Sequence, residues 1–189
     1  ELGPGAGEFK PGDRVFGDLS SGVWGGFAEY ARAKEGELAR MPDSMSFTDA
    51  AALPQAGGLA LQGLEKYGGL KAGERLLIVG AGGGVGTLAL QMAKEIGAEV
   101  ACVDRDDKLP RLLELGADRV IDYEDEDFCR EAGRYDYILE VTARRRLSEY
   151  RRALSPGGRL AAVGGLTRVI FSLLFFGGPS MRLVLHRPN

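Results

Sequence analysis

The sequence has few of the residues that build metal centres and catalytic triads. Its 189 residues include two cysteines and one histidine. Cys102 and Cys129 cannot by themselves form a disulfide framework or a four-ligand zinc site. The single histidine, His186, removes most metal and nucleophile–histidine arrangements and is expected at the surface or at an interface. We therefore predict no metal site, and we expect both cysteines to be structural.

The sequence also lacks an excess of positive charge and a long hydrophobic run. Lys and Arg number 24 and Asp and Glu number 27, which argues against a nucleic-acid partner. The longest apolar run, residues 169–176, is far shorter than the ~20 residues of a membrane-spanning helix. The N-terminus has no basic-then-apolar signal pattern. These features predict a cytoplasmic protein without a membrane span.

Glycine, in contrast, is abundant. There are 29 glycines in 189 residues, about twice the usual share of ~7%. They have no period of three, and they occur in scattered positions and in one dense cluster. This distribution predicts many tight corners in an ordinary globular protein.

Residues 1–48 consist of short strand-like pieces. Lys10–Asp13 is a turn signal, and strands are predicted at Arg14–Phe16 and Phe27–Ala31. Tyr30 is expected to be a half-buried tyrosine of the second strand. These pieces are too few and too short to bury a core alone, so they are expected to be part of a second domain.

From residue 49 to residue 189 apolar strands alternate with amphipathic helices. Ser46–Asp49 resembles a capping box, and a helix is expected to end at Gly68–Gly69. Strands are predicted at 76–79, 100–103, 120–121, 137–139, 160–163 and 183–185. Continuous apolar strands separated by helices are typical of a parallel sheet covered on both faces. We predict an α/β fold with a doubly wound sheet of six strands in the order 3-2-1-4-5-6.

The glycine cluster, Gly80–Gly86, lies directly between an apolar strand and an amphipathic helix. A pyrophosphate approaches backbone N–H groups closely only where no Cβ blocks it. The start of the following helix adds unpaired N–H donors and the positive end of its dipole. Gly86 is expected to let the helix pack against the strand. Ala81 stands at the first glycine position of the usual dinucleotide motif, which is a mild departure.

Asp104 is the second part of this signal, because it ends the next predicted strand. A carboxylate at that place accepts hydrogen bonds from ribose hydroxyls and repels a 2′-phosphate. At ~4 Å and an effective dielectric constant of ~20, one pair of unit charges is worth about 4 kcal/mol. Arg105 and Lys108 follow at once and would offset part of that repulsion. The sequence therefore favours NAD over NADP.

Two alternatives to dinucleotide binding stay open at this point. One is a glycine-rich turn of an α/β protein that binds another ligand or none. The other is a methyltransferase-type sheet, which also has a glycine turn and an acid after its second strand. The glycine spacing suits a pyrophosphate better than either.

Three further features have competing interpretations. Arg144–Arg146 and Arg151–Arg152 are predicted on one helix, where a solvated face is favoured over a phosphate contact. Glu124–Asp127 is expected to begin a surface helix. The apolar run Val169–Phe176 is expected to be a buried loop and helix or an exposed patch, and a membrane-touching patch is less favoured.

Six motifs follow one another along the chain: Lys10–Val15, Gly26–Tyr30, Ala50–Pro54, Gly80–Gly86, Leu115–Asp118 and Ile121–Tyr123. In this order they resemble the medium-chain dehydrogenases/reductases, in particular their zinc-free quinone-oxidoreductase-like branch. The resemblance covers nearly the whole chain. The resemblance implies part of a GroES-like, β-rich catalytic domain at 1–48 and a Rossmann domain at 49–189. It also implies hydride transfer between NAD(P)(H) and a quinone, an enone or another carbonyl-type substrate.

The resemblance also assigns cofactor-binding residues. Gly83, Gly84 and Val85 are expected to meet the pyrophosphate. Asp104, Arg105 and Lys108 are expected around the adenosine ribose, with Tyr123 near the adenine. Thr142 and Val163, Gly164 and Gly165 are expected on the nicotinamide side. No catalytic residue is transferred, because the substrate-facing residues of the family lie largely in a segment that precedes those matched here.

The sequence departs from the family pattern at positions that concern zinc binding and at the two ends of the chain. Gln55 stands where zinc-dependent relatives have a cysteine, so zinc is not expected. Leu59 stands where zinc-free relatives usually have a threonine. The chain is expected to lack both ends of a longer protein, so a nucleotide-binding but inactive or truncated module is the alternative function. The family further implies a homodimer formed through the edge strand Arg182–Leu185.

Overall fold

The computed structural model describes residues 1–21 and 25–185, which form two compact units. The first comprises residues 1–58 and the second residues 59–185. The sequence placed the division after residue 48. In the structure it falls at Gly58, inside helix α2 (Pro54–Glu65).

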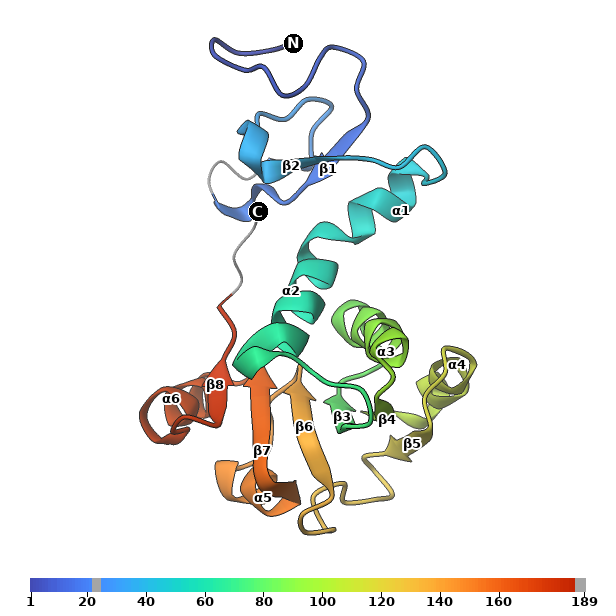
Figure 1. The fold of residues 1–189 in the computed structure, drawn as a ribbon, viewed down its shortest axis with the longest axis vertical. Helices are drawn as coiled ribbons and strands as arrows, with labels where there is room; N and C mark the ends of the chain where they lie inside the picture. The colour runs from blue at the N-terminus through green and yellow to red at the C-terminus, as the bar shows by residue number, and fades with distance from the viewer. Residues whose placement is uncertain (22–24, 186–189) are drawn as a thin grey trace. The chain divides into compact units, whose positions relative to one another are not determined.

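A two-stranded antiparallel sheet holds the smaller unit. Strand β1 (Val15–Gly17) pairs with β2 (Leu38–Arg40), as Figure 1 shows. The predicted turn before β1 is present, since the Asp13 N–H donates to the Lys10 carbonyl oxygen at 3.1 Å. The Lys10 N–H donates in return to Asp13 Oδ2 at 3.0 Å. The strand predicted at 14–16 is therefore confirmed, shifted by one residue.

Short helices complete this unit. They are the 3-10 helices η1 (Leu19–Ser21) and η2 (Glu35–Glu37) and the α-helix α1 (Phe47–Ala52). The Asp49 N–H donates to Ser46 Oγ at 3.1 Å, which satisfies one free donor of the first turn of α1. The N-cap half of the capping box predicted at 46–49 is thus confirmed, whereas Asp49 Oδ2 accepts the Ser46 hydroxyl at 2.6 Å and not the Ser46 N–H.

The strand predicted at Phe27–Ala31 is wrong. Residues 27–29 form a bend, and Phe27 and Tyr30 are 110% and 90% exposed. A short apolar segment forms a strand only when a neighbouring strand pairs with its backbone. Within residues 1–21 and 25–185 no strand pairs with this segment. Tyr30 is consequently an exposed residue and not a half-buried one.

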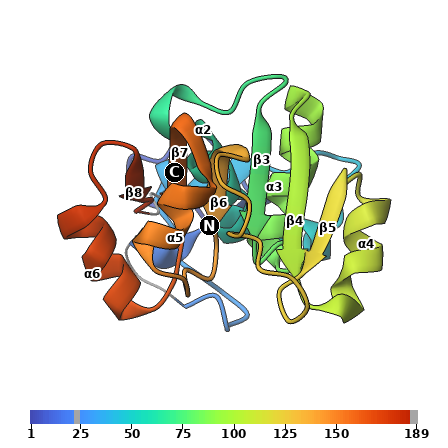
Figure 2. The same ribbon diagram turned by 90° about the horizontal axis from the view of Figure 1, so that it is seen from below.

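Six parallel strands form the sheet of the larger unit, as predicted. They are β3 (Arg75–Val79), β4 (Glu99–Asp104), β5 (Arg119–Asp122), β6 (Tyr135–Glu140), β7 (Leu154–Ala162) and β8 (Met181–Leu183). Their order is β5-β4-β3-β6-β7-β8, which is the doubly wound order 3-2-1-4-5-6 (Figures 1 and 2). Strand β8 lies at the edge of the sheet. Dimerisation through residues 182–185 stays a prediction.

Helices cover both faces of this sheet, which explains why its strands are apolar without alternation. Leu76 and Ile78 of β3 join one core, and Leu77 and Val79 join the other. The first core includes residues of α2, α3 (Gly84–Ile96) and α4 (Leu109–Glu114). The second includes residues of α5 (Leu147–Ala153) and α6 (Thr167–Phe176). The 3-10 helices η3 (Lys66–Gly68) and η4 (Asp106–Lys108) precede β3 and α4.

Two predicted helix starts are wrong. Residues 123–125 form a turn, after which the Glu126 N–H donates to the Asp122 carbonyl oxygen at 2.9 Å, and residues 124–127 are not helical. The Asp122 side chain also accepts the Glu124 N–H, so this local bonding replaces a helix. Helix α5 begins at Leu147, so Arg144–Arg146 lie in the loop after β6 and not on a helix.

The apolar run near the C-terminus is a half-buried helix. Val169 and Leu173 of α6 are buried against the sheet. Phe171, Leu174 and Phe175 on the same helix are exposed by more than half. No helix in the described part of the chain has the length and apolar content needed to cross a bilayer.

Asp136 joins three strands through its carboxylate. It accepts hydrogen bonds from the Arg75 N–H and Nε (3.0 Å each), from Arg75 Nη2 (2.9 Å) and from Ser155 Oγ (2.7 Å). The Arg75 guanidinium holds the pKa of Asp136 well below its usual value. A carboxyl group whose pKa is lowered on folding stabilises the fold above its unfolded pKa, and the stabilisation is lost as the pH falls.

Substitution Asp136→Asn is therefore expected to lower the free energy of unfolding by about 2 kcal/mol at pH 7. The difference from the wild type should shrink below about pH 4, where the carboxyl of the unfolded wild-type chain begins to take up its proton while that of the folded protein stays ionised. Urea unfolding of both proteins at neutral and acidic pH measures this difference in the free energy of unfolding. Asp125→Asn, at an exposed turn position, is the control. A loss that does not change with pH would contradict the assignment.

Candidate nucleotide-binding site

A cavity of about 390 Å³ lies at the carboxyl end of the parallel sheet. Strands β3, β4 and β6 end there. The strand order reverses between β3 and β6, because β4 and β5 are added on one side of β3 and β6, β7 and β8 on the other. Ligands of doubly wound sheets bind at this switch point. The polar and glycine residues that line the cavity are Gly80, Gly83, Asp104, Lys108, Tyr123, Glu140, Thr142, Arg144, Arg145 and Tyr150.

The glycine turn brings backbone close to backbone. The N–H groups of Gly80 and Ala81 both donate to the Val103 carbonyl oxygen, at 3.0 and 3.1 Å. Gly80 has φ 84°, a left-handed conformation that favours glycine. A Cβ on Gly86 would lie 2.4 Å from Ala81 Cα, so α3 packs on the turn only because Gly86 has no side chain. This is the packing role expected for Gly86.

The start of α3 offers N–H donors to the cavity side of the turn. Gly83 is the N-cap residue, and Gly84 and Val85 are the first two residues of α3. The N–H groups of Gly84 and Val85 have no acceptor within the helix. The Gly83 N–H makes one long hydrogen bond, to the Gly80 carbonyl oxygen at 3.5 Å. A Cβ on Gly83 would meet only the Gly80 carbonyl oxygen, at 3.7 Å. The space beside Gly83 is thus open to an anion, which the helix dipole also favours.

Asp104 ends β4 and faces this turn, with 7% of its surface exposed. Its Oδ2 accepts the Gly82 N–H at 2.7 Å, and its Oδ1 accepts the Arg105 N–H at 2.9 Å. Lys108 Nζ lies 3.0 Å from Oδ1. Two carboxylate oxygens accept about four hydrogen bonds, so Oδ2 keeps room for one more donor. The Lys108 ammonium group has further N–H donors beside this carboxylate. Asp104 and Lys108 together therefore offer an acceptor and a donor to the two hydroxyl groups of a diol.

Arg105 and Tyr123 are placed differently around this carboxylate. Arg105 turns to Asp107, with Nε 2.6 Å from Oδ1, so its charge is taken up there. The neighbouring Asp107 raises the pKa of Arg105 further. Tyr123 lines the cavity and is 45% exposed, which leaves its ring accessible to a ligand.

Glu140 and Tyr150 belong to the site but were missed in the sequence. Glu140 ends β6 with 1% of its surface exposed. Its Oε1 accepts the N–H groups of Thr142 and Ala143, at 2.7 Å each, and the Thr142 hydroxyl at 3.0 Å. Its Oε2 accepts the Tyr150 hydroxyl. Burial raises the pKa of Glu140, and these donors oppose that effect. An acid directly after the apolar run Tyr137–Leu139 was the signal that could have revealed it.

The turn held by Glu140 has a strained residue. Ala143 has φ 39°, a positive value that is uncommon outside glycine. Thr142, just before it, packs on the glycine turn: a Cβ on Gly80 would lie 2.8 Å from Thr142 Cγ2. The turn after β6 therefore forms one wall of the cavity, and Glu140 fixes its conformation.

The predicted cofactor residues divide into two groups in the structure. Gly83, Asp104, Lys108, Tyr123 and Thr142 line the cavity together. The other six, which are Gly84, Val85, Arg105, Val163, Gly164 and Gly165, are not among the described residues that line it.

Residues 163–165 pack behind the turn after β6. The Val163 N–H donates to the Glu140 carbonyl oxygen at 2.9 Å. A Cβ on Gly164 would lie 2.7 Å from the Val141 carbonyl oxygen, and one on Gly165 would lie 2.1 Å from Ala143 Cβ. These residues contact the far side of the turn that holds Thr142, which itself lines the cavity with Asp104 and Lys108. The placement of residues 163–165 beside the nicotinamide stays a prediction.

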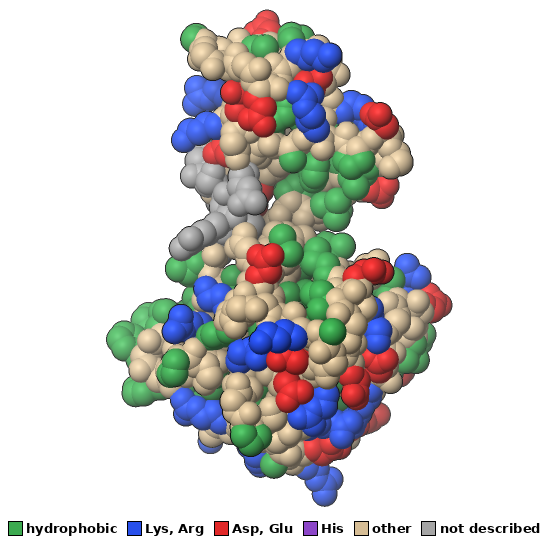
Figure 3. Space-filling model, viewed as in Figure 1, with side chains coloured by type: hydrophobic (Ala, Val, Ile, Leu, Met, Phe, Trp, Pro, Cys, Tyr) green, Lys and Arg blue, Asp and Glu red, His purple; other side chains and the backbone are tan. Residues whose placement is uncertain are grey.

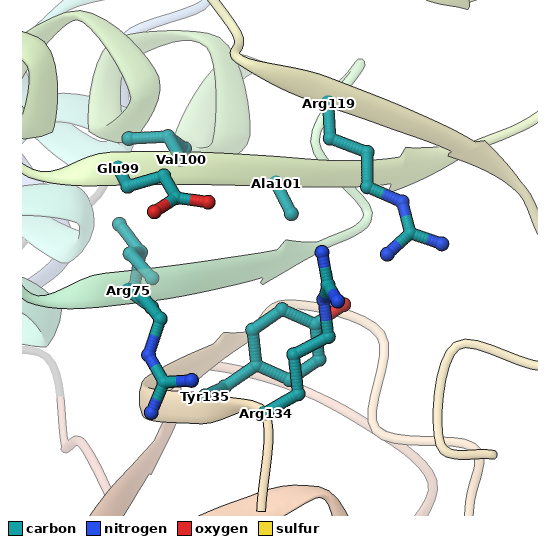
Figure 4. A pocket seen from close by; sticks show the side chains of 8 residues that line it. Arg75, Glu99, Val100, Ala101, Arg119, Arg134 and Tyr135 are labelled. Carbon is teal, nitrogen blue, oxygen red and sulfur yellow. The ribbon is translucent and has the colours of Figure 1, made fainter. Parts of the chain in front are cut away.

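A smaller pocket, of about 190 Å³, lies at the opposite, amino end of the strands. Figure 4 shows Arg75, Arg119 and Arg134 around it. Each of these arginines is paired with an acid: Asp136, Glu126 and Glu131 respectively. The charges of this pocket are therefore neutralised within the protein, and we assign it a structural role.

Neither thiol of the chain is positioned for chemistry. Cys102 and Cys129 are buried, and burial raises the pKa of each to about 12. This confirms the structural role expected for both. Within residues 1–21 and 25–185 no group of three or more His, Cys, Asp or Glu side chains could hold a metal ion. His186 lies outside the described residues.

The six-stranded doubly wound sheet with a glycine turn and a following acid defines the Rossmann class of dinucleotide-binding domains. Residues 84–184 match the model of a family described as zinc-binding dehydrogenase. The chain belongs to this family, and within it to the quinone-oxidoreductase-like branch of the medium-chain dehydrogenases/reductases.

Individual relatives agree with this membership. The chain is 38% identical over 139 residues to 2-methylene-furan-3-one reductase of Solanum lycopersicum, covering 69% of this chain and 36% of that protein. It is 34% identical over 172 residues to human quinone oxidoreductase, covering 86% and 51%. The solved quinone oxidoreductase from Coxiella burnetii superposes with a TM-score of 0.83 at 26% identity, covering 100% and 60%. The chain thus spans about half or less of the length of these two curated relatives.

Proposed function

We propose that this chain binds NAD(P)(H) at the carboxyl end of its parallel sheet and serves hydride transfer to a quinone, an enone or another carbonyl-type substrate. One observation carries the proposal. The open space beside Gly83 adjoins the first N–H groups of α3, and the buried carboxylate of Asp104 stands across from it. Names of relatives support it, because they include a quinone oxidoreductase and a furanone reductase.

Different residues of the site would bind different parts of the cofactor. Gly83, Gly84 and Val85 would donate N–H groups to the pyrophosphate. Asp104 and Lys108 would hold the adenosine ribose, the first as acceptor and the second as donor. A bound nicotinamide supplies the hydride. Glu140 would keep the turn at Thr142 in the shape that closes the cavity.

The site favours NAD over NADP within this proposal. Asp104 presents negative charge where a 2′-phosphate would lie, and Arg105 is paired with Asp107 instead of offsetting that charge. The Arg105 backbone N–H also donates to Asp104 Oδ1, but among the predicted ribose residues only Lys108 pairs with Asp104 through its side-chain charge.

We further propose that the reaction proceeds without zinc. The support is Gln55, a neutral amide that stands where zinc-dependent relatives have a thiolate ligand. Gln55 lines a cavity of about 530 Å³ formed within residues 1–58. An amide oxygen is a poor zinc ligand compared with a thiolate.

Substitution Gly83→Ala tests the proposed cofactor site. Gly83 has an extended backbone (φ −93°, ψ 175°) that alanine adopts freely, and its Cβ would contact no atom closer than 3.7 Å. The variant is expected to fold with a loss within about 1 kcal/mol, as an N-cap change. Its new methyl group would fill the anion's space, so NADH affinity should fall at least about tenfold, which is ~1.4 kcal/mol. Calorimetric titration with NADH and NADPH measures this.

Two results would count against the proposal. If the wild type binds neither NADH nor NADPH at millimolar concentration, the site is not a nicotinamide-cofactor site. If Gly83→Ala binds as tightly as the wild type, the pyrophosphate lies elsewhere. Binding without turnover of quinones or enones would favour the alternative, a nucleotide-binding but inactive module.

Substitution Asp104→Asn tests cofactor choice. The amide keeps the shape and an acceptor oxygen, but it removes the charge that opposes a 2′-phosphate. The ratio of NADPH to NADH affinity is expected to rise about tenfold or more, since one such charge pair is worth up to about 4 kcal/mol. Asp106→Asn, an exposed neighbour, is the matched control. An unchanged ratio would refute the role of Asp104.

A further inference from the structure

A second cleft, of about 360 Å³, lies between the start of α5 and the helix α6. Of the ten described residues that line it, five are arginines and none is acidic. They come from three segments: Arg144, Arg145 and Arg146 from the loop after β6, Arg151 from α5 and Arg168 from α6. The backbone thus gathers positive charge from distant parts of the chain into one concave surface.

Most of this charge is not neutralised within the protein. Arg145 pairs with Glu149 at 3.1 Å, and Arg151 donates to the Phe176 carbonyl oxygen. The side chains of Arg144, Arg146 and Arg168 have no hydrogen bond or ion pair in the described part of the chain. The pocket at the amino end of the strands differs, because all three of its arginines have acidic partners.

The remaining wall of the cleft is apolar. Leu147, Val169 and Phe176 line it beside Ser148 and Ser172. Phe176 is 71% exposed, and the exposed face of α6 continues from it with Phe171 and Phe175. In Figure 3 hydrophobic side chains gather along the edge of the surface where α6 lies. A ligand of this cleft would therefore meet guanidinium groups and aromatic rings together.

We propose that the cleft between α5 and α6 binds a phosphate group attached to an apolar body. Several guanidinium groups converging on one site favour a multiply charged oxyanion, because each presents paired N–H donors in a plane. The apolar wall and the adjoining face of α6 take the non-polar part of the same molecule. The cleft is separate from the cofactor cavity, although Arg144 and Arg145 line both.

The test compares two double variants of equal charge. Arg146→Gln/Arg168→Gln removes two cleft arginines that do not line the cofactor cavity. Lys71→Gln/Arg111→Gln removes two exposed cations that do not line the cleft. The probes are inorganic pyrophosphate, titrated in the presence of excess NADH so that the proposed cofactor cavity is filled, and vesicles of phosphatidylcholine with phosphatidylglycerol. Vesicles of phosphatidylcholine alone are the zwitterionic control. Calorimetry and vesicle flotation report binding, and NADH titration checks the cofactor site in parallel.

The cleft variant is expected to bind pyrophosphate or the anionic vesicles at least tenfold more weakly than the wild type. The control variant should bind like the wild type. Pyrophosphate binding would identify a soluble phosphate compound, and binding to anionic vesicles alone would identify a lipid headgroup. Equal binding by both variants, or no binding of either probe by the wild type, would overturn the proposal. The NADH titration is a separate measurement on the same proteins. A wild type that does not bind NADH would contradict the cofactor assignment, whatever the result for the cleft.

Discussion

Substitution Glu140→Ala is expected to lower the free energy of unfolding by about 4 kcal/mol, the largest effect of any single change considered for this chain. The carboxylate accepts four hydrogen bonds while almost fully buried. Its removal leaves the N–H groups of Thr142 and Ala143 and the Tyr150 hydroxyl without their acceptor. A buried donor without a partner costs its full desolvation free energy.

The same change is expected to weaken nicotinamide-cofactor binding, because Thr142 lines the cavity and its turn would relax. Chemical unfolding and NADH titration measure the two effects separately. Glu140→Gln is the matched comparison, since it keeps one acceptor oxygen for the backbone N–H groups. A Glu140→Ala protein that is as stable as the wild type would contradict the role assigned to this carboxylate.

Substitution Gly86→Ala is expected to cost about 3 kcal/mol of folding stability, as in other overpacked sites. The added Cβ would lie 2.4 to 2.6 Å from three backbone atoms of Ala81, and backbone atoms cannot rotate away. The gain in helix propensity, about 1 kcal/mol, would offset only part of this cost.

Gly83→Ala is the natural control for this change, because it lies in the same turn. Its Cβ meets open space, so the variant should keep its stability while losing cofactor affinity. Thermal unfolding of both variants with and without NADH separates the two roles. If Gly86→Ala were as stable as Gly83→Ala, α3 would not depend on close contact with the turn.

Much of the larger unit could be predicted because its information is local. Leu76–Val79 forms a strand buried on both sides, and the residues at 85, 89, 92, 93 and 96 form one helical face. Each such pattern depends on a few consecutive residues. The handedness of strand–helix–strand connections then leaves few possible sheet orders, and the order 3-2-1-4-5-6 followed.

Predictions failed where a neighbour decides the outcome. Phe27–Ala31 has the short apolar and aromatic composition of a strand, but no strand in the described residues pairs with it. Glu124–Asp127 looks like a helix start, but the Asp122 side chain fixes a turn there. Arg144–Arg146 looked like part of a helix face, and the carboxylate of Glu140 holds the preceding residues in a turn instead.

The sequence by itself determined the sheet, the glycine turn and the acid at the end of the next strand, because each is encoded by residues close together in the chain. Only the tertiary structure decided that Glu140 supports the turn at Thr142, that Arg105 is turned to Asp107, and that arginines from α5, α6 and a loop share one cleft. The physical reason is that hydrogen bonding, charge pairing and burial depend on distances in space, which no spacing along the chain specifies.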